Sequence, residues 1–175
     1  MGDKMPPQSW EDDLRVSRER LNKHLPDEYD LTLTLLKGHL IVEEEINELL
    51  ELIVPRPEHL SNARFGFIQR LRVLQTVCAA EALDRTVPAI KILNNARNAL
   101  AHQLEPKEFD KLIQNFNNAA LRAAPNISGL GPLTTYPDDE SKQLHQKTML
   151  RIGLSIIVGN IGYIKRLRWE VISDA

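Results

Sequence analysis

Apolar residues recur every three or four positions along most of this 175-residue chain, and few stretches alternate apolar and polar residues. That spacing matches the turn of an α-helix, whereas a half-buried strand alternates with period two. The clearest case is residues 30–53, whose apolar stripe consists of Leu35, Leu36, Val42, Ile46, Leu49, Leu50 and Ile53. The whole chain has only 8 glycines to interrupt helices, so this periodicity predicts an all-α fold.

Six helical segments are predicted, at residues 10–23, 30–53, 62–83, 88–105, 106–123 and 139–172. Asp30 and Ser61 are suitable N-caps, Pro55 and Pro57 stop the second helix, and Pro88 suits the first turn of the fourth. Pro and Gly residues between positions 124 and 137 predict a loop. We therefore expect an antiparallel bundle of about five or six helices around one core.

The length predicts a single helical domain over residues 30–175, preceded by a loosely attached N-terminal helix or arm at 1–29. Lys and Arg number 22 against 24 Asp and Glu, so no overall basic field attracts nucleic acid. A lone cysteine, Cys78, excludes an internal disulfide framework and a Cys-rich zinc site. We expect no metal and no cofactor.

The N-terminus shows no apolar signal-peptide core, which predicts a cytoplasmic protein. The longest apolar run, residues 149–164, is interrupted by Arg151 and Asn160 and is too short for a membrane span. Its region also carries Gly153, Gly159 and Gly162, which each cost a helix about 1 kcal/mol relative to Ala. Close helix packing would offset that cost, either at a dimer interface or within the core.

The segment from Arg97 to His102 carries the candidate chemistry. The two residues lie five positions apart, about 140° around a helix, so only fraying of the last turn would bring them together. Arg97 is a fixed cation, His102 titrates near neutrality, and Asn98 can bind a substrate oxygen. Such groups suit metal-free phosphodiester transesterification, in which a base deprotonates a ribose 2′-hydroxyl and a cation stabilises the phosphorane. Alternatively, the helix dipole alone favours cations at this position.

Residues 97–102 (RNALAH) resemble the R-x4–6-H motif of HEPN domains, the higher eukaryotes and prokaryotes nucleotide-binding superfamily. The lead-in at 93–96 (LNNA) and the segments 35–47 and 64–71 resemble helices of a bacterial HEPN subgroup. The resemblance implies a helical bundle that forms a homodimer, with the two motifs meeting in a cleft.

Many HEPN proteins are metal-independent endoribonucleases of toxin–antitoxin, phage-defence or RNA-processing systems. By this resemblance Arg97 would hold the scissile phosphate, His102 would be the general base or acid, and Asn98 would support them. RNA would be the substrate, and an antitoxin or regulatory protein a partner. Other HEPN proteins are non-catalytic modules that bind a nucleotide or regulate a protein, which is the alternative here.

His39, Glu43 and Asn47 lie at i, i+4 and i+8 along the edge of the apolar stripe of the second helix. They are candidate supporting residues, forming a polar seam that faces the fourth helix, with Glu43 paired to Arg97. Alternatively, residues 43–45 are a solvated acidic run and His39 is a semi-buried residue with its hydrogen bonds satisfied.

Basic residues cluster in and after the third predicted helix: Arg64, Arg70, Arg72, Arg85 and Lys91. Arg70, Arg72 and Lys91 are candidate substrate-binding residues in a local phosphate patch. The alternative is a solvated helix face with intrahelical ion pairs.

A third hypothesis is that the chain is a structural interaction protein, in which Arg97 only pairs with Glu43. A nuclease requires Arg97 and His102 to be exposed, whereas a structural role buries and pairs them.

Overall fold

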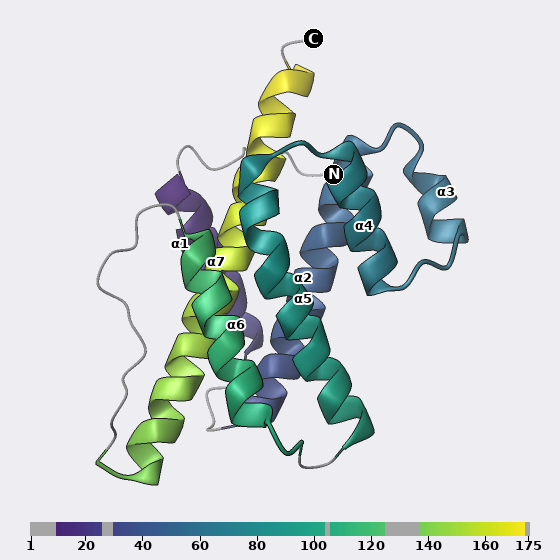
Figure 1. Cartoon of the computed structure of the whole chain (residues 1–175). Helices are drawn as coiled ribbons and strands as arrows, with labels where there is room; N and C mark the ends of the chain where they lie inside the picture. Colours follow the sequence, from purple (N-terminus) through teal and green to yellow (C-terminus); the bar gives the residue numbers. More distant parts are fainter. Residues whose placement is uncertain (1–9, 26–29, 104–105, 125–136, 174–175) are drawn as a thin grey trace.

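The computed structural model describes residues 10–25, 30–103, 106–124 and 137–173. Within these ranges the chain forms seven α-helices and no strand (Figure 1). The helices are α1 (Trp10–His24), α2 (Leu31–Ile53), α3 (Pro57–Asn62), α4 (Phe67–Val77), α5 (Glu81–His102), α6 (Phe109–Ala123) and α7 (Asp139–Ser173). The predicted all-α bundle is confirmed. The loop predicted at 124–137 lies almost wholly outside the described residues.

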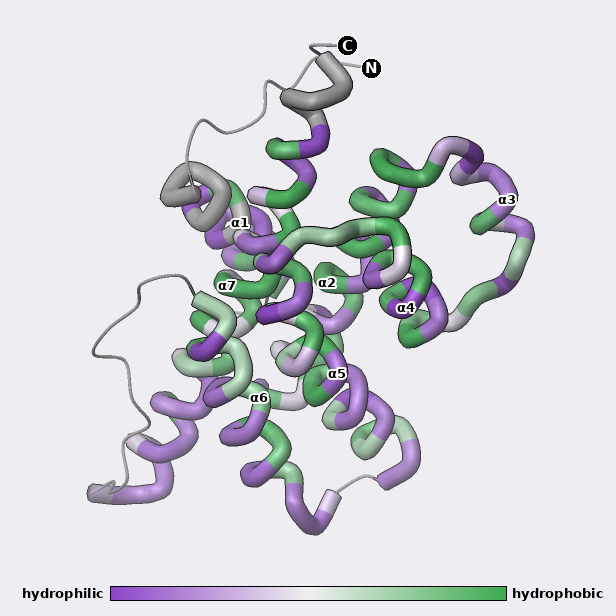
Figure 2. Tube along the Cα trace, turned by 45° about the horizontal axis from the view of Figure 1, so that its top comes forward, coloured by the Kyte–Doolittle hydropathy of each residue, from purple (hydrophilic) through white to green (hydrophobic). Residues whose placement is uncertain are grey.

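Helix α2 buries most of the apolar stripe that the sequence predicts for residues 30–53. Five of the seven stripe residues are buried, and hydrophobic residues gather where the helices face one another (Figure 2). The Asp30 carboxylate accepts a hydrogen bond of 2.8 Å from the Leu33 amide, as an N-cap does. Pro57, expected only as a stop, also begins the short helix α3, which contains Ser61 rather than being capped by it. The cap and the stop of α2 are therefore confirmed, and the cap at Ser61 is wrong.

The single helix predicted over 62–83 is wrong, because the chain breaks between α4 and α5. Cys78 and Ala80 adopt extended backbone angles there, and α5 begins at Glu81 with Pro88 inside it. Glu81 and Asp84 favour the earlier start because acidic residues stabilise a helix N-terminus. The break lets α4 pack on α2 while α5 packs on α6 and α7.

The last helix, α7, contacts α1, α2, α5 and α6. Its direction corrects the antiparallel prediction. Lys142 pairs with Asp110 at 2.7 Å, and further along both helices Asn160 donates to the Ala123 carbonyl at 3.0 Å. Positions on α6 and α7 thus rise together, so these two helices run parallel.

Two glycines permit the close approach of α7 to its neighbours. A Cβ on Gly153 would lie 2.7 Å from the Phe116 ring and 3.2 Å from the Ala120 Cβ, both on α6. A Cβ on Gly38 of α2 would overlap a methyl carbon of Leu154 on α7. Gly153 therefore serves the core, which is one of the two roles that the sequence left open, rather than a dimer interface.

A charged cluster joins α1, α2 and α7. Glu45, only 5% exposed, pairs with Arg20 of α1 and with Lys165 of α7, the latter at 2.6 Å. Lys165 also pairs with Glu48 at 2.5 Å. Burial lowers the pKa of Lys165 below its usual value. Burial alone would raise the pKa of Glu48, but Lys165 and Arg20 together lower it. The acidic run at 43–45 is thus not uniformly solvated.

The N-terminal helix belongs to the same core. Leu21 and Leu25 are 1% and 4% exposed and pack with the apolar residues of the other helices.

None of the helices in the described ranges has the length and hydrophobicity needed to cross a membrane.

We expect Gly153→Ala to destabilise the protein. Overpacking against Phe116 and Ala120 costs about 2–3 kcal/mol, which exceeds the ~1 kcal/mol gained in helix propensity. The expected net loss is about 1–2 kcal/mol in the free energy of unfolding, measured by urea denaturation. Gln143→Ala, exposed on the same helix, is the control and should change stability by less than about 0.5 kcal/mol. A stabilised Gly153→Ala protein would contradict the close contact of α6 and α7.

We expect Glu45→Gln to lower the free energy of unfolding by about 2–3 kcal/mol, because it leaves Arg20 and Lys165 without their buried carboxylate. That is less than the ~3–5 kcal/mol typical of a fully buried pair, since both cations reach solvent. Glu44→Gln is the matched control, because Glu44 pairs with Arg20 from an exposed position and should matter by under about 0.5 kcal/mol. Equal losses in the two variants would remove the special role of Glu45.

Candidate functional site

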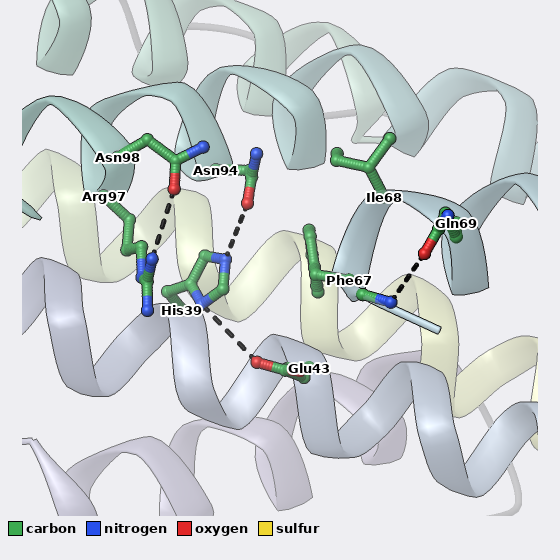
Figure 3. A pocket seen from close by; sticks show the side chains of 9 residues that line it. His39, Glu43, Phe67, Ile68, Gln69, Asn94, Arg97 and Asn98 are labelled. Atoms are coloured by element: carbon green, nitrogen blue, oxygen red, sulfur yellow. Dashed lines mark hydrogen bonds and ion pairs between the residues drawn. The ribbon is translucent and has the colours of Figure 1, made fainter. Parts of the chain in front are cut away.

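An open pocket of about 410 Å³ lies between α2, α4 and α5 (Figure 3). Its lining residues come from all three helices and the residue before α4: His39, Glu43, Gly66, Phe67, Ile68, Gln69, Asn94, Arg97 and Asn98. Four candidates from the sequence, His39, Glu43, Arg97 and Asn98, are brought together here.

His39 is held at the base of the site by contacts from three helices. The side chain is 3% exposed, and its Nε2 lies 3.3 Å from Oδ1 of Asn94 on α5. Its ring centroid is 4.5 Å from that of Phe67, at the start of α4. Its Nδ1 lies 3.9 Å from Oε2 of Glu43, one turn along α2. The predicted seam along α2 therefore faces α5 at His39.

The amide oxygen of Asn94 can only accept, so Nε2 of His39 carries the ring proton and Nδ1 keeps its lone pair. Burial lowers the pKa of His39 below its usual value. The Asn94 hydrogen bond and the Glu43 carboxylate act in the opposite direction, and the Arg97 charge adds to the lowering. His39 is thus a neutral imidazole at neutral pH, with its free nitrogen on the side of Glu43.

Arg97 and Asn98 lie on the exposed side of the pocket. The Arg97 side chain is exposed, and its Nη1 donates to Oδ1 of the half-buried Asn98 at 3.2 Å. Among the described residues Arg97 forms no ion pair, so the predicted pairing with Glu43 is wrong. Glu43 lies against His39 instead, within its own helix. The pocket therefore presents an arginine that pairs with no carboxylate of the described residues, although Glu43 lines the same pocket.

His102 does not line the pocket. It is the last residue of α5 and is exposed. Asn94, Asn98 and His102 lie at i, i+4 and i+8, so they follow one side of the helix from the pocket toward its end. His102 is one turn, about 6 Å along the axis, beyond Asn98.

The remaining candidates lie outside the pocket. Asn47 accepts a 2.6 Å hydrogen bond from Nη1 of Arg70, whose Nε donates to the Phe65 carbonyl at 3.0 Å. Arg70 is thus engaged in tying the start of α4 to α2, which positions the Phe67 wall of the pocket. Arg72 and Lys91 are exposed and are not lining residues.

Arg85 pairs with Glu81 within α5 at 2.5 Å, as the alternative of intrahelical pairs anticipated.

Sequence reasoning missed two important lining residues, Asn94 and Phe67. Asn94 had a signal, because it precedes Arg97 by three positions and Asn98 by four and so shares their side of the helix. Phe67 had none, since its place depends on the break before α5. Within the described ranges no group of three or more His, Cys, Asp or Glu side chains could hold a metal ion.

Comparison with known proteins gives no match for the chain among family models, curated proteins or solved structures. The pocket and the exposed motif on α5 are therefore the observations from which a function is argued.

We expect the two charged neighbours to shift the pKa of His39 in opposite directions. Glu43→Gln should lower that pKa, because it removes a carboxylate that stabilises the imidazolium. Arg97→Gln should raise it, because it removes a repelling cation. Titration of the histidine side-chain NMR signals measures both shifts, and exposed His59 serves as an internal reference. Shifts of the same sign would contradict the placement of His39 between these charges.

Proposed function

We propose that the protein is a metal-independent endoribonuclease that cleaves RNA by 2′-hydroxyl transesterification at the end of α5. The observation that carries the proposal is the exposed Arg97 beside Asn98 in an open pocket of suitable size for part of a nucleotide. A structural role would bury Arg97 against a carboxylate, and no such pair forms in the described part of the chain.

In this proposal Arg97 holds the scissile phosphate, and its fixed charge stabilises the developing phosphorane. Asn98 orients the guanidinium through its hydrogen bond at 3.2 Å and offers its amide hydrogens to a phosphate oxygen. His102 exchanges a proton with the substrate beyond the pocket. An exposed imidazole can do so because either ring nitrogen can give or accept a proton. Exposed Arg72 and Lys91 would add only weak, general attraction for RNA.

The proposal includes the HEPN-like character of the bundle and a homodimer. The exposed position of His102 at the end of α5 supports this, because a second chain can approach it there. A toxin or defence role, with an antitoxin or regulatory protein as partner, and a cytoplasmic location belong to the same proposal.

A panel of labelled RNAs incubated in EDTA tests the activity. We expect wild-type protein to cut at least one RNA and leave 2′,3′-cyclic phosphate ends. Arg97→Ala and His102→Ala should each slow cleavage by about 100-fold or more. Arg56→Ala removes an exposed cation outside the pocket and should leave the rate unchanged. Cleavage by both site variants at the wild-type rate would exclude these residues from the reaction.

A second function is favoured by one observation, the position of His102 outside the pocket. Even without His102, the pocket has groups that bind an anion. The protein could therefore be a non-catalytic module that binds a nucleotide or RNA end. In that case wild-type protein would leave every RNA intact, and Arg97→Ala would weaken nucleotide binding measured by calorimetry.

A further inference from the structure

The buried histidine of the pocket lies outside the motif on α5, yet its imidazole is held by contacts from neighbouring helices. His39 is 3% exposed and is held by Asn94 and Phe67, whereas His102 is exposed at a helix end. A general base works best when its free nitrogen is fixed in position. His39 meets this requirement better than His102 does.

The hydrogen bond to Asn94 determines which nitrogen is free. Because Nε2 donates to the Asn94 oxygen at 3.3 Å, the lone pair is on Nδ1. Glu43 lies 3.9 Å from Nδ1, which is beyond ordinary hydrogen-bonding distance but close enough to stabilise an imidazolium. The arrangement offers a proton acceptor with a carboxylate beside it.

Arg97 connects this acceptor to the bound phosphate. The guanidinium lines the same pocket as His39, and its charge lowers the pKa of the imidazole. A phosphate bound to Arg97 would offset that charge and raise the pKa of His39 from its lowered value, although burial would still lower it. Binding of the substrate would thereby make His39 a stronger base.

We infer that His39 is the general base of the pocket, that its Nδ1 accepts the 2′-hydroxyl proton of an RNA whose phosphate is held by Arg97, and that Glu43 positions and stabilises the resulting imidazolium. The inference rests on the proposed function and names a further catalytic residue for it. Glu43 acts only through His39 and is a positioning residue.

Cleavage of the RNA begins with proton transfer to His39. The O–H bond of the 2′-hydroxyl breaks, its proton moves to Nδ1 of His39, and the 2′-oxygen forms a bond to phosphorus. The bond from phosphorus to the 5′-oxygen breaks, and its electron pair stays on that oxygen, which takes a proton from the imidazolium of His102. The products are a 2′,3′-cyclic phosphate and a 5′-hydroxyl. Both imidazoles return to their starting states by proton exchange with water.

The charged groups acting on His39 come from two helices, Glu43 on α2 and Arg97 on α5. The pocket residues contributed by α4 are Phe67, Ile68 and Gln69, none of which titrates. Where α7 packs on α2 it presents the apolar Leu154 to the neighbouring Gly38. A pH profile of cleavage can therefore be interpreted through Glu43 and Arg97.

Single-turnover cleavage of an RNA cut by the wild type, measured across pH in EDTA, tests the inference. His39→Gln keeps an amide hydrogen for Asn94 but removes the base, and should slow cleavage by about 100-fold to 10,000-fold. Its affinity for the same RNA with a 2′-deoxy residue at the cut site should stay within about threefold. Glu43→Gln should move the acid limb of the rate profile to lower pH, since it lowers the pKa of the base. His59→Gln, on exposed α3, is the matched control and should behave as wild type.

The outcomes distinguish the role of His39 as general base from the proposed endoribonuclease activity. If His39→Gln cuts at the wild-type rate while Arg97→Ala does not, the endoribonuclease proposal stands and His39 is structural. Wild-type protein that cuts no RNA would overturn both. Should His39→Gln fail to fold, as judged by circular dichroism, Glu43→Gln decides, and an unmoved acid limb would overturn the inference.

Discussion

The absence of a side chain at Gly38 determines where α2 lies, and the pocket depends on that position. Leu154 of α7 occupies the space that a Cβ would take, so the two helices approach more closely than larger residues allow. The next residue, His39, points about 100° away around the helix and so faces α5 rather than α7. The contact that anchors α2 in the core thus also aims the histidine into the pocket.

The helices that strong periodicity defines could be predicted from sequence. The stripe of α2 and its cap at Asp30 follow local rules, and these rules also hold in the structure. The break at residues 78–80 could not be predicted, because neither Gly nor Pro marks it and the local sequence is compatible with a helix. The packing of α4 and α5 on α2, with α5 also against α6 and α7, decides it, and such contacts leave no local signal. The parallel direction of α7 is likewise a property of the assembled core.

The candidate site was only partly predictable for the same reason. Spacing along a helix places Arg97, Asn98, His39 and Glu43 on defined sides of their own helices, and all four line the pocket. The rotation of one helix against another is not contained in that spacing. It places Asn94, rather than Arg97, against His39 and leaves Glu43 beside the histidine. It also gives Arg70 an internal partner in Asn47, which the cluster of basic residues did not reveal.

The central place of α7 has a consequence for the order of folding during synthesis. A nascent chain that has left the ribosome only as far as α6 lacks the surface against which α1, α2, α5 and α6 pack. In that state Gly38 has no Leu154 beside it, and the buried carboxylate of Glu45 lacks Lys165. The apolar residues of these helices that face α7 therefore stay uncovered until translation has supplied that helix. Since α2 contributes two of the pocket's three charged or titratable side chains, His39 and Glu43, the position of the site depends on the core that α7 completes.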